Sequence, residues 1–179
     1  MSNYAIHKDP DIIQFHIPRW KELPNIDLYL DQIITILDNS LTMYIQTDIS
    51  KNDKENKIIT KTMINNYVKH KILDAPVNKK YNKIHIAKLF VICILKQLYS
   101  INDINNLINF ATSTTSIEIA YNQFCSELEK AISIIFNAEE MSHKKDITQE
   151  QYVLKNVVQS FASKLYVERM YIKKQQFTH

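Results

Sequence analysis

The fold is decided by residues Ile59–Leu107, ITKTMINNYVKHKILDAPVNKKYNKIHIAKLFVICILKQLYSINDINNL. The order of residues predicts a short polar helix, a turn that contains Pro76 and several lysines, and then an apolar helix. A further helix is expected to begin at Ser100, whose hydroxyl suits an N-cap. The rest of the chain is interpreted outward from this stretch.

The short helix has two unlike sides. Ile64, Tyr67 and Val68 recur at helical spacing, which indicates a buried side. The opposite side is polar and consists of Lys61, Asn65, Asn66 and Lys69. Asparagine side chains can hydrogen-bond base edges in a major groove, with a preference for adenine, and lysines can meet phosphates.

A basic turn follows within a dozen residues and contains Asn78, Lys79, Lys80, Tyr81 and Lys83. Its place after the polar helix is typical of a wing that would contact the DNA backbone. We therefore predict base contacts for Asn65 and Asn66. Backbone contacts are predicted for Lys61, Lys69, Lys79 and Lys80. Asn78 and Lys83 are predicted to bind DNA as further residues of the basic turn. The plainer alternative, a solvated helix surface in a chain rich in Asn and Lys, stays open.

The 179-residue chain contains no glycine. A Gly-rich phosphate loop or dinucleotide fingerprint is therefore excluded, and two-residue hairpins are disfavoured. With 45% hydrophobic residues, the chain can bury a core. Its net charge of +3 permits binding to nucleic acid but does not require it. We predict an all-α fold.

No metal, cofactor or catalytic pattern is evident. Cys93 and Cys125 lie within apolar helical patterns without paired ligand spacing, so both are interpreted as buried thiols of a reducing compartment. The histidines His70, His85 and His143 lack partners at ligand intervals. The sequence predicts a non-enzymatic protein, although a triad assembled in space would escape this reasoning. No apolar run approaches ~20 residues and no signal peptide is evident, so we expect a cytoplasmic protein without membrane contact.

Three segments are predicted: an N-terminal arm over residues 1–24, a DNA-binding domain over 25–110, and a C-terminal helical part over 111–179. Phe15, Ile17 and Trp20 are expected to pin the arm, and residues 46–58 to form a polar loop. Helices are expected to begin at Asn25, Thr60 or Thr62, Asn82, Ser100, Thr115 with Glu118, and Thr148 with Gln151. Their expected ends include Tyr99, Phe110, Ala138 and Lys173.

The central stretch resembles the DNA-binding half of MerR-type winged helix-turn-helix regulators. The matching positions are Tyr67, Ile72-Leu73 with Pro76, Lys80-Tyr81 and Ser100–Ile104. The chain departs from that family at Lys71, where a glycine usually follows the recognition helix. Either the turn takes another shape, or Lys71 stays helical.

A longer resemblance is to the YkrK-like family of low-GC Gram-positive bacteria, a domain of unknown function related to the MerR-like fold. The matching runs are Ile17–Ile33, Thr60–Leu73, Lys79–Ala87 and Ile92–Ile104. The resemblance implies a winged helix-turn-helix with a small wing and a helical C-terminal part.

The function expected from these observations is that of a transcriptional regulator that binds double-stranded DNA as a homodimer through its C-terminal helices. A small-molecule effector could bind between those helices, near Tyr121, Phe124 and Tyr166. The alternative is a helical protein–protein interaction module on the same scaffold that does not bind DNA.

Overall fold

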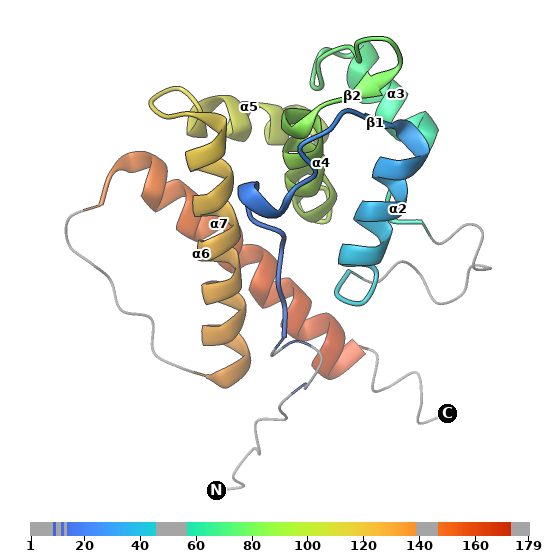
Figure 1. Ribbon diagram of the computed structural model, residues 1–179. Coiled ribbons are helices and arrows are strands. Elements are labelled where there is room, and N and C mark those ends of the chain that lie inside the picture. The colour runs from blue at the N-terminus through green and yellow to red at the C-terminus, as the bar shows by residue number, and fades with distance from the viewer. Residues whose placement is uncertain (1–8, 10–11, 13, 46–56, 139–146, 173–179) are drawn as a thin grey trace, which may run out of the picture. The chain divides into compact units, whose positions relative to one another are not determined.

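The structure, a computed structural model, describes residues 9, 12, 14–45, 57–138 and 147–172 (Figure 1). The chain forms two compact units: a central unit, Ile17–Asn122, and a terminal unit, Met1–His16 with Gln123–His179. Within the described residues, regular structure comprises six α-helices, two short η-segments and one two-stranded sheet. The expectation of a helical protein is confirmed.

The central unit contains most of these elements. They are η1 (Trp20–Glu22), β1 (Leu28–Tyr29), α2 (Leu30–Leu41), α3 (Lys61–Lys69), β2 (Lys80–Tyr81), α4 (Lys83–Leu95), α5 (Ile101–Ala111) and the first turns of α6 (Ile117–Asn137). The terminal unit contains the rest of α6, then α7 (Gln149–Val167) and the π-helical η2 (Glu168–Ile172).

Side-chain caps fix where several helices begin. The Thr60 hydroxyl accepts a hydrogen bond from the Met63 N–H, so Thr60 rather than Thr62 caps α3. Ser100 caps α5 in the same way. Thr148 and Gln151 exchange reciprocal hydrogen bonds at the start of α7. These expectations are confirmed, because each cap satisfies backbone donors that a first turn leaves unpaired.

Helix α4 is the buried spine of the central unit. Nine of its residues are buried, and both Leu89 and Leu95 lie in the core, as the sequence predicted. The helix ends at Leu95 instead of the expected Tyr99. The Leu95 carbonyl there accepts from the N–H groups of both Leu98 and Tyr99, which closes a turn. Cys93 and Cys125 are both buried, as interpreted.

The helix expected from Asn25 is present as α2, but its expected start is wrong, because the helix begins only at Leu30. Leu28 and Tyr29 instead form β1, which pairs antiparallel with β2 in the register Leu28↔Tyr81. Tyr29 then stands before α2, where the Gln32 side chain accepts from its N–H at 2.9 Å. The sequence missed the strand because its partner lies about fifty residues later. Ile26, placed on the buried stripe, is 68% exposed.

Helix α6 also begins slightly later than predicted. Its cap is Ser116, whose hydroxyl accepts from the Ile119 N–H at 3.3 Å. The expected capping box of Thr115 with Glu118 is therefore replaced by a cap one residue further on. The stripe that continues along the helix is buried as predicted at Phe124 and Leu128.

The segment that enters the central unit is pinned to the start of α6. The Tyr121 hydroxyl donates to the Pro18 carbonyl at 2.8 Å, and the Trp20 N–H donates to the Asn122 side chain at 2.9 Å. Ile17 is fully buried. Most of the expected arm before it, and residues 46–56 of the expected polar loop, lie outside the described residues.

In the terminal unit, one side of α7 is buried, and its buried residues are Val157, Val158, Phe161, Ala162 and Leu165. The Phe136 and Tyr166 rings meet edge to face with centroids 5.2 Å apart. An ion pair of 2.6 Å joins Arg169 to Asp9. Among the described helices, none has the length and hydrophobicity that a membrane span requires.

Candidate nucleic-acid interface

Helix α3 presents a complete polar face. Its buried side chains are Ile64 and Tyr67, and the helix packs against α2. The exposed residues are Lys61, Thr62, Asn65, Asn66 and Lys69. They recur at intervals of three and four, so they share the side opposite the buried pair. The structure thus brings the four predicted α3 residues onto one exposed surface.

Lys71 adopts the left-handed conformation with φ 59°. The Ile72 N–H donates to the Tyr67 carbonyl at 2.9 Å, and the Lys71 N–H donates to the Val68 carbonyl at 3.0 Å. This pair of bonds is a Schellman motif, which ends the helix and turns the chain. Both sequence alternatives at Lys71 are wrong: the residue is not helical, and the turn does not take another shape, because this lysine adopts the left-handed conformation that usually favours glycine.

The basic turn is a tight hairpin despite the absence of glycine. Val77 and Lys80 exchange backbone hydrogen bonds of 3.0 and 2.9 Å. The two residues between them, Asn78 and Lys79, have φ values of 51° and 62°, as in a type I′ turn. The absence of glycine disfavoured such a hairpin, yet the hairpin forms. Asn78 tolerates the left-handed region, and Lys79 is held there by the flanking bonds.

The hairpin is anchored at its base by β1. Lys80 pairs with Tyr29 across the two strands, and its ammonium lies 5.2 Å from the centre of the Tyr29 ring. The Lys83 ammonium lies 5.4 Å from the centre of the Trp20 ring. These cation–π contacts hold the two lysines and leave them charged. Asn78 and Lys79, at the tip, are exposed.

Lys61 is already paired within the unit. Its ammonium lies 2.7 Å from a carboxylate oxygen of Asp31 on α2, and both side chains face solvent. Such a pair adds little stability, but a phosphate that approached Lys61 would also meet the charge of Asp31. The sequence did not reveal this contact, because the two residues belong to different helices.

The segment that precedes α3 is held by two polar side chains, one from α2 and one from just after α4. The ammonium of Lys96, the residue that follows α4, donates to the Ile58 carbonyl. Burial lowers the pKa of Lys96. Burial also raises the pKa of Asp38 on α2, while a hydrogen bond from the Ile58 backbone opposes that shift. The two side chains therefore hold the backbone N–H and the carbonyl of Ile58, shortly before the Thr60 cap.

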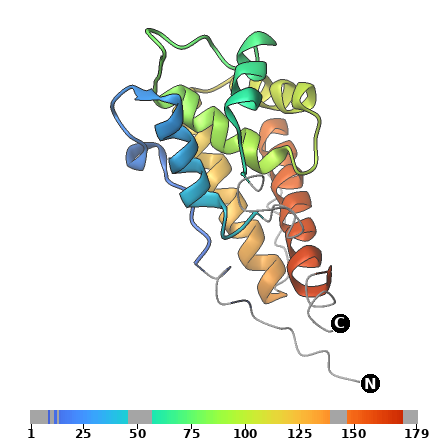
Figure 2. The ribbon, with the colours of Figure 1, turned by 90° about the vertical axis from the view of Figure 1, so that its right-hand side faces the viewer.

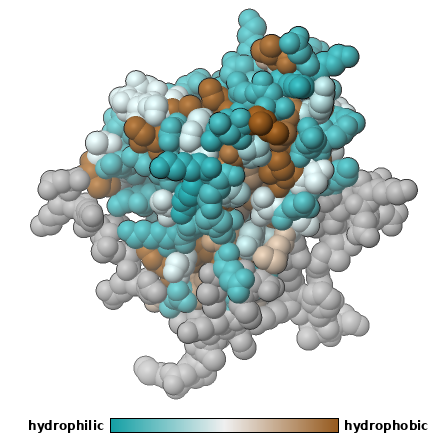
Figure 3. Space-filling model, in the orientation of Figure 1, coloured by the Kyte–Doolittle hydropathy of each residue, from teal (hydrophilic) through white to brown (hydrophobic). Residues whose placement is uncertain are grey.

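Figures 1 and 2 both place α3 and the hairpin at the same end of the central unit (top in each view). The space-filling view shows this end as mostly hydrophilic, with small hydrophobic areas among the polar atoms (Figure 3). Exposed apolar side chains of the hairpin and β1 include Val77 at 70% and Tyr29 at 54%. The surface is thus polar and basic but not uniformly so.

The connection between α2 and α3 spans residues 42–60. A helix-turn-helix joins its two helices by a turn of about three to four residues. The pair α2–α3 is in contact but is linked by a much longer segment.

Within the described residues, no cluster of three or more His, Cys, Asp or Glu side chains could hold a metal ion. Burial raises the pKa of the Cys93 thiol to about 12, which keeps it protonated.

These features define a small helical unit with an exposed polar helix and a basic hairpin. The family model described as Domain of unknown function (DUF1836) matches residues 18–124, more than half of the chain, and the chain belongs to this family. The matched residues cover nearly the whole central unit, including α3 and the hairpin. No curated protein and no solved structure gives a significant match.

Proposed function

We propose that this chain is a non-enzymatic transcriptional regulator whose central unit binds double-stranded DNA in the manner of a MerR-like winged helix-turn-helix, with a connection between α2 and α3 that is longer than the usual turn of that motif. In this proposal α3 is the recognition helix and the hairpin of Val77–Lys80 is the wing. One observation carries it: the polar face of α3 is exposed along its whole length while Ile64 and Tyr67 are buried. The resemblances to the MerR-type and YkrK-like families support the same assignment.

The structure allows the proposed contacts to be ranked. Asn65, Asn66 and Lys69 are exposed, and within the described residues no hydrogen bond or ion pair engages their side chains. We assign base contacts to the two asparagines and a phosphate contact to Lys69. At the wing, Asn78 and Lys79 are the first to meet a phosphate, followed by Lys80 and Lys83, whose cation–π contacts leave their charge available.

The proposal is tested by recovering genomic DNA bound to the tagged full-length chain and by measuring binding to the enriched duplex as a function of salt. Lys79→Ala should weaken binding to all duplexes and reduce the slope of log K against log salt by about one, since one phosphate contact is lost. Lys130→Ala, an exposed lysine on α6, is the matched control and should change neither quantity. Failure to enrich any sequence, with no salt-dependent binding, contradicts the proposal.

We further propose that the protein acts in the cytoplasm as a homodimer, because helix-turn-helix regulators read paired half-sites with two-fold symmetry. In this proposal the C-terminal helices provide the interface, and the same region binds a small-molecule effector as a second ligand. Light scattering at tens of micromolar should give twice the chain mass. A monomer at that concentration contradicts this part of the proposal. DNA binding by a single chain at a single site would then remain.

A second candidate function, a protein-interaction module without DNA binding, is favoured by a different observation. Three exposed apolar side chains gather around the small sheet: Ile26, Tyr29 and Val77. A protein partner would cover such side chains, whereas a phosphate backbone would not. The substitution Ile26→Ser separates the two functions, because Ile26 is exposed but belongs neither to the hairpin nor to the cation–π contact of Lys80. It should leave DNA affinity within about two-fold if DNA is the ligand, and it should abolish partner capture if a protein is.

A further inference from the structure

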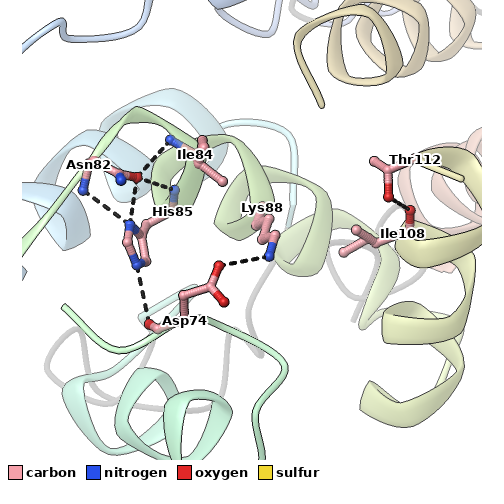
Figure 4. A network of polar contacts seen from close by, with 7 residues as sticks. All are labelled: Asp74, Asn82, Ile84, His85, Lys88, Ile108 and Thr112. Atoms are coloured by element: carbon pink, nitrogen blue, oxygen red, sulfur yellow. Dashed lines mark hydrogen bonds and ion pairs between the residues drawn. The ribbon is translucent and has the colours of Figure 1, made fainter. Parts of the chain in front are cut away.

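His85 joins three segments of the central unit. Its imidazole lies in the first turn of α4 and is only 5% exposed. Nε2 lies 3.2 Å from the carbonyl oxygen of Asp74, in the segment between α3 and the hairpin. Nδ1 lies 3.1 Å from the backbone nitrogen of Asn82 and 2.7 Å from the Asn82 side-chain oxygen (Figure 4).

These contacts select one neutral form of the ring. With the proton on Nε2, the ring donates to the Asp74 carbonyl, and Nδ1 accepts from the Asn82 N–H. With the proton on Nδ1, two donors would face each other at Asn82 and two acceptors at Asp74. The Asn82 oxygen also accepts from the N–H groups of Ile84 and His85, at 3.0 and 3.3 Å, which fixes its amide orientation. The Nε2–H form leaves a single mismatch, between Nδ1 and that oxygen.

We infer that His85 is a positioning residue which, in its neutral Nε2–H form, ties the base of the hairpin to the segment leaving α3, and that its protonation weakens this joint. A proton on Nδ1 gains the Asn82 oxygen as an acceptor but removes the acceptor of the Asn82 N–H. It also places a charge in a buried site. The inference goes beyond the proposed function and does not depend on DNA binding.

Several charged or titratable groups face the ring. Asp74 forms an ion pair of 3.1 Å with Lys88, and the Tyr81 ring meets the imidazole edge to face at 5.3 Å. Burial is the main cause that lowers the pKa of His85. The hydrogen bond to the Asp74 backbone and the charges of Asp74 and Asp27 raise the pKa, and the charge of Lys88 lowers it further.

The direction of the pH effect follows. Because the folded pKa of His85 lies below its ordinary value of 6.5, the unfolded chain binds the proton more readily. The stability that neutral His85 contributes is therefore present above pH 6.5 and is lost as the pH falls through the folded pKa. The joint holds at neutral pH and weakens in mild acid.

The test uses nitrogen-15 chemical shifts of the full-length chain, with His85 assigned by comparison with His85→Gln. We expect an Nε2–H imidazole at about pH 7.5 and a midpoint of protonation below 6.5. An Nδ1–H form, or a midpoint at or above 6.5, overturns the inference. This measurement uses the wild-type protein, and the assignment can rest on backbone connectivities if the variant fails to fold.

Thermal unfolding supplies a second measurement. A glutamine amide at position 85 can donate to the Asp74 carbonyl and accept from the Asn82 N–H without titrating, whereas His85→Leu can do neither. The Tm of wild type relative to His85→Gln should fall as the pH decreases from about 7.5 to about 5, and His85→Leu should be less stable than His85→Gln throughout. His70→Gln, an exposed histidine in the turn after α3, is the matched control and should keep the wild-type pH profile. A Tm difference between wild type and His85→Gln that does not change with pH contradicts the inference.

Discussion

Helices α3 and α4 are neighbours in the chain and begin in the same way, each with a polar cap, yet they differ in what they bury. Helix α4 is enclosed on nearly all sides, whereas α3 buries Ile64 and Tyr67 and exposes the rest of its polar face. The stability of the central unit therefore depends mainly on α4. Because α3 contributes little burial, its exposed positions can carry residues that suit a ligand with little change in the free energy of unfolding.

The largest expected effect lies in α4. Leu89→Ala should lower the free energy of unfolding by about 2–5 kcal/mol, because a cavity adds to the lost transfer free energy of a fully buried side chain. Chemical denaturation measures it. Lys69→Ala on the exposed face of α3 is the control and should stay within about 0.5 kcal/mol of wild type. Equal losses at the two positions would erase the contrast between the helices.

The next effect concerns binding and lies in α3. Asn65→Ala or Asn66→Ala should cost about 1–3 kcal/mol at the cognate duplex if the residue makes a bidentate contact with adenine. Nonspecific affinity and thermal stability should change little. Asn106→Ala, an exposed asparagine on α5, is the control and should leave cognate affinity unchanged. An equal loss on cognate and random duplexes would remove the base-reading role from the substituted asparagine.

A smaller effect is expected where α3 ends. Lys71→Gly should raise the free energy of unfolding by about 1 kcal/mol, because glycine removes the steric cost of the left-handed conformation. Lys130→Gly, inside the regular helix α6, should instead lower it by about 0.5–1 kcal/mol. Denaturant midpoints of the two variants would show opposite signs. Destabilisation by Lys71→Gly would mean that the Lys71 side chain contributes more than its backbone costs.

The smallest effect is expected at the ion pair that joins Lys61 on α3 to Asp31 on α2. Asp31→Asn should strengthen binding to any duplex by less than about 1 kcal/mol, because a carboxylate beside Lys61 no longer repels phosphate. The same substitution in a Lys61→Ala background separates this repulsion from the release of Lys61. If Asp31→Asn leaves affinity unchanged at low salt, the end of α3 that carries Lys61 does not approach the DNA backbone.

Features encoded by local patterns were predictable from the sequence. The caps at Thr60, Asn82 and Ser100, the buried spine of α4 and the two-sided character of α3 each follow from residues within a few positions. The segment that enters the central unit is instead held by Asn122 and Tyr121 from far along the chain, and no local pattern indicates these contacts.

Other features depended on contacts between distant residues or on the backbone. Strand β1 exists because β2 pairs with it, and the local apolar spacing at Ile26 and Tyr29 favoured a helix instead. The hairpin places Asn78 and Lys79 at positive φ without glycine, which composition alone argued against. The contacts of Lys61, Lys80 and His85 with other segments were likewise beyond a pattern-based analysis.

The central claim, that the exposed face of α3 reads DNA, is tested most directly by wild-type binding to the enriched genomic duplex and to a scrambled duplex of the same composition at one near-physiological salt concentration. The account predicts that the full-length chain binds the enriched duplex at least about a thousand-fold more tightly, as specific regulators do. Equal affinity for the two duplexes, or no binding to either, would contradict it.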